Sequence, residues 1–230
     1  MAIAHVQTPA VVVVTAQSSN RAFASNVTAG NTIIVCVVNG VGGGAAIVTS
    51  VTDTLSNTYV QAGVGNTHGN FREEIWYALN ISGGSCTVTV NMNKSTDLSF
   101  TISEFSGIAT SSAVDVTGGA TGTSTQATVN LTTTNSDDVL VGVMDHAGST
   151  QVLTSGTNFT MLQESEAVAK MPIHSEYRIV TSTGTYAVPV DIAASVAWGI
   201  YAASFKQVAG GGLSIPVAMF HYNHHIGSGV

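Results

Sequence analysis

Charged side chains are scarce in this chain of 230 residues, since only 8% are charged while 44% are hydrophobic. A disordered chain needs high charge and low hydrophobicity, and a helical bundle needs many Glu and Lys residues, so both classes are excluded. Thr, Ser, Val, Gly and Asn fill most of the remainder, which is typical of β-structure with many turns. Six bases against thirteen acids give a net charge of −7 without a run of either sign, so nucleic acid is excluded as a partner.

The chain also lacks long apolar runs and has only two cysteines. No run approaches the roughly 18 to 20 residues of a membrane helix, so we expect neither an integral membrane protein nor a membrane partner. The first residues, MAIAHVQTPAVVVVTAQ, lack the basic start and cleavage site of a secretory signal, which indicates folding in the cytosol. Cys36 and Cys86 lie in strand-like runs, so we expect two buried free thiols, with a disulfide across a sandwich as the alternative.

Two segments of the chain align with each other without a gap. Residues 77–105 (YALNISGGSCTVTVNMNKSTDLSFTISEF) lie over residues 177–205 (YRIVTSTGTYAVPVDIAASVAWGIYAASF) at an offset of 100. Upstream, NTIIVCVVN from Asn31 matches DDVLVGVMD from Asp137 at an offset of 106. We interpret the chain as an internal duplication. The matched positions include Tyr77 with Tyr177, Gly84 with Gly184, Val88 with Val188, and Phe105 with Phe205.

Strand and turn patterns fill both halves of the duplication. Residues 85–92 (SCTVTVNM) alternate with period two, which predicts a strand with one wet face. Residues 98–105 and 198–205 are interpreted in the same way, whereas TIIVCVV and VLVGVM are continuous apolar runs that predict strands buried on both faces. Turn signals separate these runs, and no segment has a sustained 3.6-residue apolar period.

The predicted fold class is therefore all-β, with two tandem antiparallel β-sandwich units of immunoglobulin-like or jelly-roll type. Residues 1–107 form the first unit, residues 108–208 the second, and residues 209–230 a C-terminal arm that begins at a glycine hinge. The alternative is that the two halves pair into one larger sandwich.

Groups for catalysis are few, and none forms a recognised motif. Glu73 and Glu74 adjoin on a predicted strand, where neighbouring side chains point to opposite faces, so we expect them to be solvated at the surface. Asp145 and His146 follow an apolar run and are expected in a solvated loop. The segment from His174 (HSEYR) predicts an exposed charge ladder, with a sugar-contacting patch as the alternative. Because the chain has no GxSxG sequence either, we expect no enzyme, no catalytic residues and no cofactor.

Carbohydrate binding by stacked aromatics is the other class of function considered. Trp76 and Trp198 lie inside predicted strands among alternating apolar residues, so we interpret both as core residues. The remaining aromatics are too scattered along the sequence to define a sugar-binding platform.

The C-terminal arm, residues 209–230, has no counterpart in the first half. Its apolar run SIPVAMF would be costly to expose to water, so we expect it to be buried against its own domain or, as the glycine hinge favours, against another subunit. The predicted assembly interface consists of Ile215, Val217, Met219, Phe220, His221 and Tyr222. A metal site shared between chains would use His221, His224 and His225, but one chain offers no complete ligand set, so we predict no metal and interpret these histidines as polar interface residues.

The ordered series TAGNTIIV, VTDTLSNTYV, IWYALNISGGSCTVTV, FTISEFSGIATSSAVDVT, TTTNSDDVLVGV and STGTYAVPV resembles a group of uncharacterised β-rich proteins of bacteria and tailed phages. The resemblance covers most of residues 25 to 207. The phage members look like virion structural proteins, so the resemblance implies a non-enzymatic virion component. The C-terminal arm lies outside the pattern.

We therefore expect a capsid decoration or cement protein, or a related appendage subunit, that assembles in the bacterial host cytoplasm as a homo-oligomer with other virion proteins. The alternative is a carbohydrate-binding or adhesin module that contacts a glycan on a host or extracellular cell surface.

Overall fold

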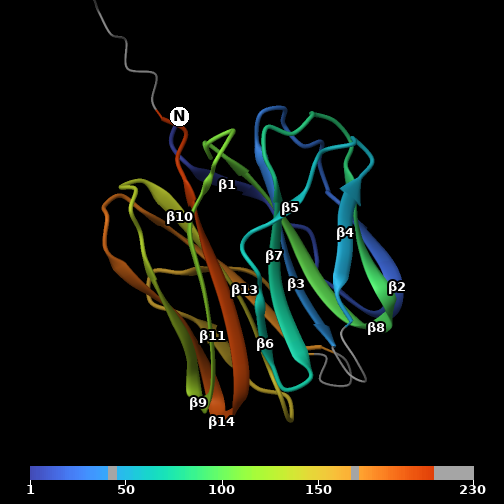
Figure 1. Ribbon diagram of the computed structural model, residues 1–230, viewed down its shortest axis with the longest axis vertical. Helices are drawn as coiled ribbons and strands as arrows, with labels where there is room; N and C mark the ends of the chain where they lie inside the picture. The colour runs from blue at the N-terminus through green and yellow to red at the C-terminus, as the bar shows by residue number, and fades with distance from the viewer. Residues whose placement is uncertain (41–45, 167–170, 210–230) are drawn as a thin grey trace, which may run out of the picture.

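A computed structural model describes residues 1–40, 46–166 and 171–209 of the chain. Within these ranges the fold is all-β, with fourteen strands and no helix, as predicted. The strands form two antiparallel sheets of eight and six strands, and Figure 1 shows the first half of the chain on one side and the second half on the other. The predicted arm, including Ile215, Val217, Met219, Phe220, His221, Tyr222, His224 and His225, lies outside the described residues.

The first sheet has the strand order β1-β8-β3-β7-β5, with β2 and β4 also paired to β8 and β6 paired to β7. β8 is long because its two ends pair with different neighbours: β3 takes its second half and β4 its first half. The strands are β1 (Ala4–Gln7), β2 (Val12–Ala22), β3 (Thr32–Gly40), β4 (Val48–Asp53), β5 (Val60–Gln61), β6 (Asn66–His68), β7 (Phe71–Ala78) and β8 (Thr87–Ser106).

The second sheet has the order β11-β14-β10-β13-β12, and β9 pairs with β14 along most of its length. Here β14 takes the place that β8 has in the first sheet, since its two ends pair with β11 and β10. The strands are β9 (Val114–Thr132), β10 (Asp138–His146), β11 (Leu153–Ser155), β12 (Thr160–Ser165), β13 (Ile173–Val180) and β14 (Thr185–Lys206).

Three apolar clusters hold the molecule together. One belongs to the first sheet and contains Val35 and Phe100, and one belongs to the second sheet and contains Leu140 and Ile200. The third, which we call the inter-sheet layer, takes residues from both sheets. Since β3 and β10 lie between their own sheet's core and this layer, every residue in both strands is buried, as the continuous apolar runs predicted. The inter-sheet layer includes Ile34, Cys36, Val38, Ile75, Phe105, Val139, Val141, Val143, Ile173, Tyr201 and Phe205.

Aromatic side chains cross the inter-sheet layer in two reciprocal pairs. Tyr77 of the first sheet contacts Phe205 of the second with ring centroids 5.3 Å apart at 73°. Tyr177 of the second contacts Phe105 of the first at 5.4 Å and 78°. Both are edge-to-face contacts, and both phenylalanines are fully buried. The four residues that match at the ends of the aligned segments therefore meet across the layer.

The strand ladders correct one detail of the sequence alignment. Ile34 lies opposite Tyr77 and Ser103, while Val141 lies opposite Tyr177 and Ala203. Positions in β3 and β10 therefore correspond at an offset of 107, whereas the sequence match used 106. Since a shift of one residue moves a side chain to the opposite face of a strand, the apolar runs alone did not fix this register.

Other patterns had mixed outcomes. Residues 86, 88, 90 and 92 are buried and their neighbours are partly exposed, so the predicted alternation is confirmed. The alternation expected for residues 98–105 and 198–205 is wrong, because both segments are buried throughout between a sheet core and the inter-sheet layer. Cys36 and Cys86 are buried free thiols, and they lie in different clusters.

Candidate functional site

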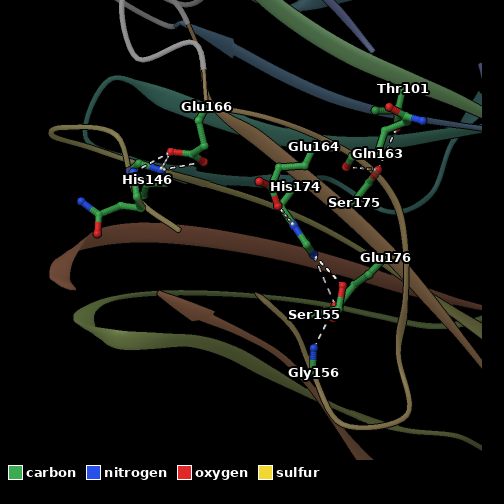
Figure 2. A network of polar contacts seen from close by, with 11 residues as sticks. Thr101, His146, Ser155, Gly156, Gln163, Glu164, Glu166, His174, Ser175 and Glu176 are labelled. Atoms are coloured by element: carbon green, nitrogen blue, oxygen red, sulfur yellow. Dashed lines mark hydrogen bonds and ion pairs between the residues drawn. The ribbon is translucent and has the colours of Figure 1, made fainter. Parts of the chain in front are cut away.

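The second sheet contains a buried histidine with the connectivity of a hydrolytic triad. His174 on β13 places Nε2 3.0 Å from Ser155 Oγ on β11, and its Nδ1 lies 3.0 Å from Glu164 Oε2 on β12 (Figure 2). The sequence shows no nucleophile motif at Ser155, because the three groups come from separate strands and meet only in the folded sheet.

A second carboxylate changes the chemistry of this histidine. Glu176 Oε2 lies 3.5 Å from His174 Nε2 and also accepts a hydrogen bond from the backbone N–H of Gly156 at 3.1 Å (Figure 2). Burial alone would lower the pKa of His174, but the hydrogen bonds and charges of Glu164 and Glu176 outweigh burial and raise the pKa above its ordinary value.

The resulting site favours an imidazolium ion over a neutral base. A general base that activates a serine must be unprotonated, and the raised pKa of His174 works against that state. The N–H of Gly156 follows Ser155 and would be the natural oxyanion donor, but it is bonded to Glu176. The geometry therefore describes a histidine held between two carboxylates, which ties β11, β12 and β13 together.

A second histidine at the end of β10 has a similar arrangement. His146 Nε2 lies 3.0 Å and 3.2 Å from the two carboxylate oxygens of Glu166. The backbone N–H of Gln151 donates to Glu166 Oε2 at 2.8 Å, and Figure 2 shows Glu166 beside the imidazole. This contact joins the end of β10 to the segments that precede β11 and follow β12.

The structure corrects the expected exposure of these residues. Asp145, His146 and His174 are each at most 1% exposed, so the predicted solvated loop and the predicted charge ladder are both wrong. Each residue lies in a strand that is buried on both faces. The local sequence does not show that a second layer packs on these strands.

Glu73 and Glu74 are also buried rather than solvated, although they do point in different directions as predicted. Glu74 forms an ion pair with Arg72 and accepts a hydrogen bond from Trp76 Nε1 at 2.7 Å. Glu73 instead accepts hydrogen bonds from Asn66 Nδ2 at 2.7 Å and contacts His68 Nδ1 at 3.0 Å.

Within the described ranges, one group of three side chains has metal-ligand chemistry. It consists of His68, Glu73 and Asp145, whose ligand atoms lie within 4.8 Å of one another. Nothing in the sequence relates the three residues to one another, because Asp145 lies on a different sheet from the other two.

The tryptophans pack against the sheet cores, as predicted. Trp198 is 6% exposed and its Nε1 donates to Ser124 Oγ at 2.8 Å. Trp76 is half-buried against the core of the first sheet. One aromatic group is partly accessible in the second sheet: Arg178 lies 5.2 Å from the ring centre of Tyr186 and 6.0 Å from that of Phe159.

Comparisons of the chain with protein-family models, with curated proteins and with solved structures return no match. In the part of the chain that the structure describes, no helix has the length and apolarity needed to cross a membrane.

Proposed function

We propose that this chain is a non-enzymatic structural subunit of a tailed-phage particle, most simply a decoration or cement protein on the capsid. The observation that carries the proposal is the use of the buried ionisable groups. His146 and His174 are held by carboxylates from neighbouring strands, which stabilises the sheet and leaves little capacity for acid–base chemistry. The sequence resemblance to phage virion proteins is the reason for proposing that this stable module belongs to a phage particle.

The inter-sheet layer supports the internal duplication that we propose for residues 1–107 and 108–208. Tyr77 with Phe205 and Tyr177 with Phe105 form the pattern of a two-fold interface, in which residue i contacts j and j contacts i. The matching ladder positions of Ile34 and Val141 agree with the same two-fold relation. In this interpretation, two immunoglobulin-like or jelly-roll units associate as two copies of one subunit would.

The arm, residues 209–230, supplies the assembly contact in this proposal. The last residues before it are anchored, because the N–H of Val208 donates to Gly107 O at 2.8 Å and Gln207 Oε1 accepts a hydrogen bond from the N–H of Ile3. The described part of the chain therefore ends in an anchored segment. An apolar arm that starts there would add buried area between neighbouring subunits of a homo-oligomer.

The direct test is quantitative mass spectrometry of purified virions. A decoration protein should be present in high copy number relative to the major capsid protein, and absence from the particle would refute the proposal. Deletion of residues 209–230 should leave a folded chain that no longer assembles. If the truncated chain unfolds or aggregates, the arm is instead part of a domain core.

A carbohydrate-binding or adhesin module on a cell surface is the second candidate. The partly accessible group of Phe159, Arg178 and Tyr186 favours it, because it combines aromatic surface with the hydrogen-bond donors of a guanidinium. A glycan array would show binding that Tyr186→Ala abolishes, and such a chain would be present at only a few copies per virion. Equal signals for the parent protein and this variant would reject Tyr186 as a glycan contact.

A further inference from the structure

The group of His68, Glu73 and Asp145 lies at one end of the inter-sheet layer. Glu73 on β7 has the same facing as Ile75, which is in the layer, and Asp145 follows Val143 on the layer face of β10. His68 Nδ1 lies 3.0 Å from Glu73 Oε1 and 3.3 Å from Asp145 Oδ1. One carboxylate therefore comes from each sheet, and the imidazole touches both.

Asp145 has no hydrogen-bonded environment that would explain a buried carboxylate. It is fully buried, and among the described residues neither Oδ1 nor Oδ2 has a hydrogen-bond partner of normal geometry. Buried polar atoms of this kind call for a ligand, since leaving them unsatisfied costs free energy.

The positions equivalent to Glu73 and Asp145 in the other half of the chain show that charged groups are not needed at this level of the inter-sheet layer. By the ladder register, Val38 corresponds to Asp145 and Ile173 corresponds to Glu73. Val38 and Ile173 are both fully buried in the layer. Val38 lies directly opposite Glu73 in the ladder between β3 and β7, so aliphatic side chains and acids occupy equivalent positions at the same level of the layer.

Gly199 makes room for the three side chains. It lies opposite Asp145 in the ladder between β10 and β14. A Cβ atom at this position would collide with His68 Nδ1 and Glu73 Oε1, so only glycine leaves these two ligand atoms in place. The corresponding residue of the first sheet is Ser99, which has a side chain and donates its hydroxyl proton to Met171 O across the layer.

We propose that His68, Glu73 and Asp145 bind one divalent transition-metal ion that joins the two sheets. Two carboxylate oxygens and an imidazole nitrogen suit Zn²⁺, Co²⁺ or Mn²⁺, whereas Mg²⁺ and Ca²⁺ prefer oxygen ligands alone. Metal–ligand bonds of about 2.0–2.2 Å place neighbouring ligand atoms roughly 3 to 3.5 Å apart. The separations of 3.0 Å and 3.3 Å from His68 Nδ1 fall in that interval. The ion balances the two buried carboxylates and gives Asp145 the partner it lacks.

The site needs no assumption about the biological role of the chain, so its test is independent of the virion proposal. The full chain is used, with His221, His224 and His225 replaced by glutamine so that they cannot bind the metal. This protein is unfolded in guanidinium with EDTA and refolded without metal or with Zn²⁺, Co²⁺ or Mg²⁺. Bound metal is counted by mass spectrometry, and Tm is measured by circular dichroism.

One Zn²⁺ or Co²⁺ per chain is expected, with visible absorption bands from Co²⁺. At a free concentration near 100 times Kd, Tm should rise by about 5–10 °C, while Mg²⁺ leaves it unchanged. Asp145→Asn and His68→Gln should each weaken Zn²⁺ binding by at least about 100-fold. Glu74→Gln is the matched control, because Glu74 adjoins Glu73 on β7 but is paired with Arg72, and it should keep the Zn²⁺ response if it folds.

Two results would overturn the metal site. One is a Tm of the refolded protein that is the same with and without Zn²⁺ and Co²⁺. The other is Zn²⁺ binding that is equally tight in Asp145→Asn and in its parent. If Asp145→Asn does not refold, Gly199→Ala supplies the same comparison, since its methyl group occupies the space beside His68 and Glu73.

Discussion

Replacing Phe205 with alanine should destabilise both sheets together, although the residue belongs to the second. Phe205 is fully buried in the inter-sheet layer, opposite Val139 in its own sheet and 5.3 Å from the ring of Tyr77 in the other. Truncation of a buried phenylalanine removes its transfer free energy and leaves a cavity, which together cost about 3–5 kcal/mol. The edge-to-face contact accounts for about 0.5–1.5 kcal/mol of this loss.

The two tryptophans allow each sheet to be followed separately. Trp76 lies in the first sheet and Trp198 in the second, so Trp198→Phe leaves a reporter for the first sheet and Trp76→Phe a reporter for the second. Guanidinium unfolding followed by fluorescence should give one transition in both backgrounds. Phe205→Ala should move that transition by the same amount in each, with an unchanged m value.

Phe105→Ala provides the matched comparison, because Phe105 makes the reciprocal contact with Tyr177 and is also buried. Its cost should equal that of Phe205→Ala within about 1 kcal/mol, with a small excess since Phe105 also contacts His5 at 5.3 Å. The reasoning fails if Phe205→Ala leaves the Trp76 transition in place while it shifts that of Trp198. The sheets would then unfold independently, and the inter-sheet layer would contribute little to stability.

Three further predictions concern His174, the hydroxyl of Tyr201 and the two buried thiols. The raised pKa of His174 means that its stabilising effect is complete below the ordinary value of 6.5 and is lost as pH rises through the folded-state pKa. The free energy of unfolding should therefore fall over that pH range, and His174→Gln should remove this part of the pH dependence. A pH profile that is the same in His174→Gln and in the parent protein would contradict the ion pairs. Tyr201→Phe should cost about 1–3 kcal/mol in guanidinium unfolding because it leaves Ala62 O without its buried hydroxyl donor; a cost below about 0.5 kcal/mol would mean that water replaces the hydroxyl. Burial raises the pKa of both Cys36 and Cys86 to about 12, so a thiol reagent at pH 8 should modify them only in denaturant, and rapid labelling of the native chain would show that the cores open.

Strand existence could be predicted from the sequence because it depends on local periodicity. Residues 86–92 alternate in burial as their side chains alternate in polarity, and the apolar runs of β3 and β10 are buried on both faces. Register was less accessible. The residues on both sides of Val139 in β10 are apolar, so β3 aligns with β10 equally well at an offset of 106 and at the true offset of 107. Only the ladder partners Tyr77 and Tyr177 distinguish the two.

The candidate site could not be predicted from the sequence because its contacts are made between strands. His174 meets Glu164 and Ser155, and Asp145 meets His68 from the other sheet. The sequence does contain a weak signal. No glycine or proline separates Asp145 and His146 from the apolar run before them, which is typical of a strand that continues through these residues. The sequence interpretation ended the strand too early and so assigned both residues to solvent.

The inter-sheet layer connects these observations. Two sheets that meet through reciprocal aromatic pairs would be expected to have matching residues at equivalent positions, and the aromatic pairs themselves meet this expectation. The positions equivalent to Glu73 and Asp145 do not match them, because they hold the aliphatic residues Ile173 and Val38. Buried carboxylates without partners reduce stability, so a sequence selected for stability alone would favour aliphatic side chains at both sets of positions. The group of His68, Glu73 and Asp145 is therefore a part of the inter-sheet layer where stability depends on something besides packing, and a bound cation there would fix the relative position of the sheets.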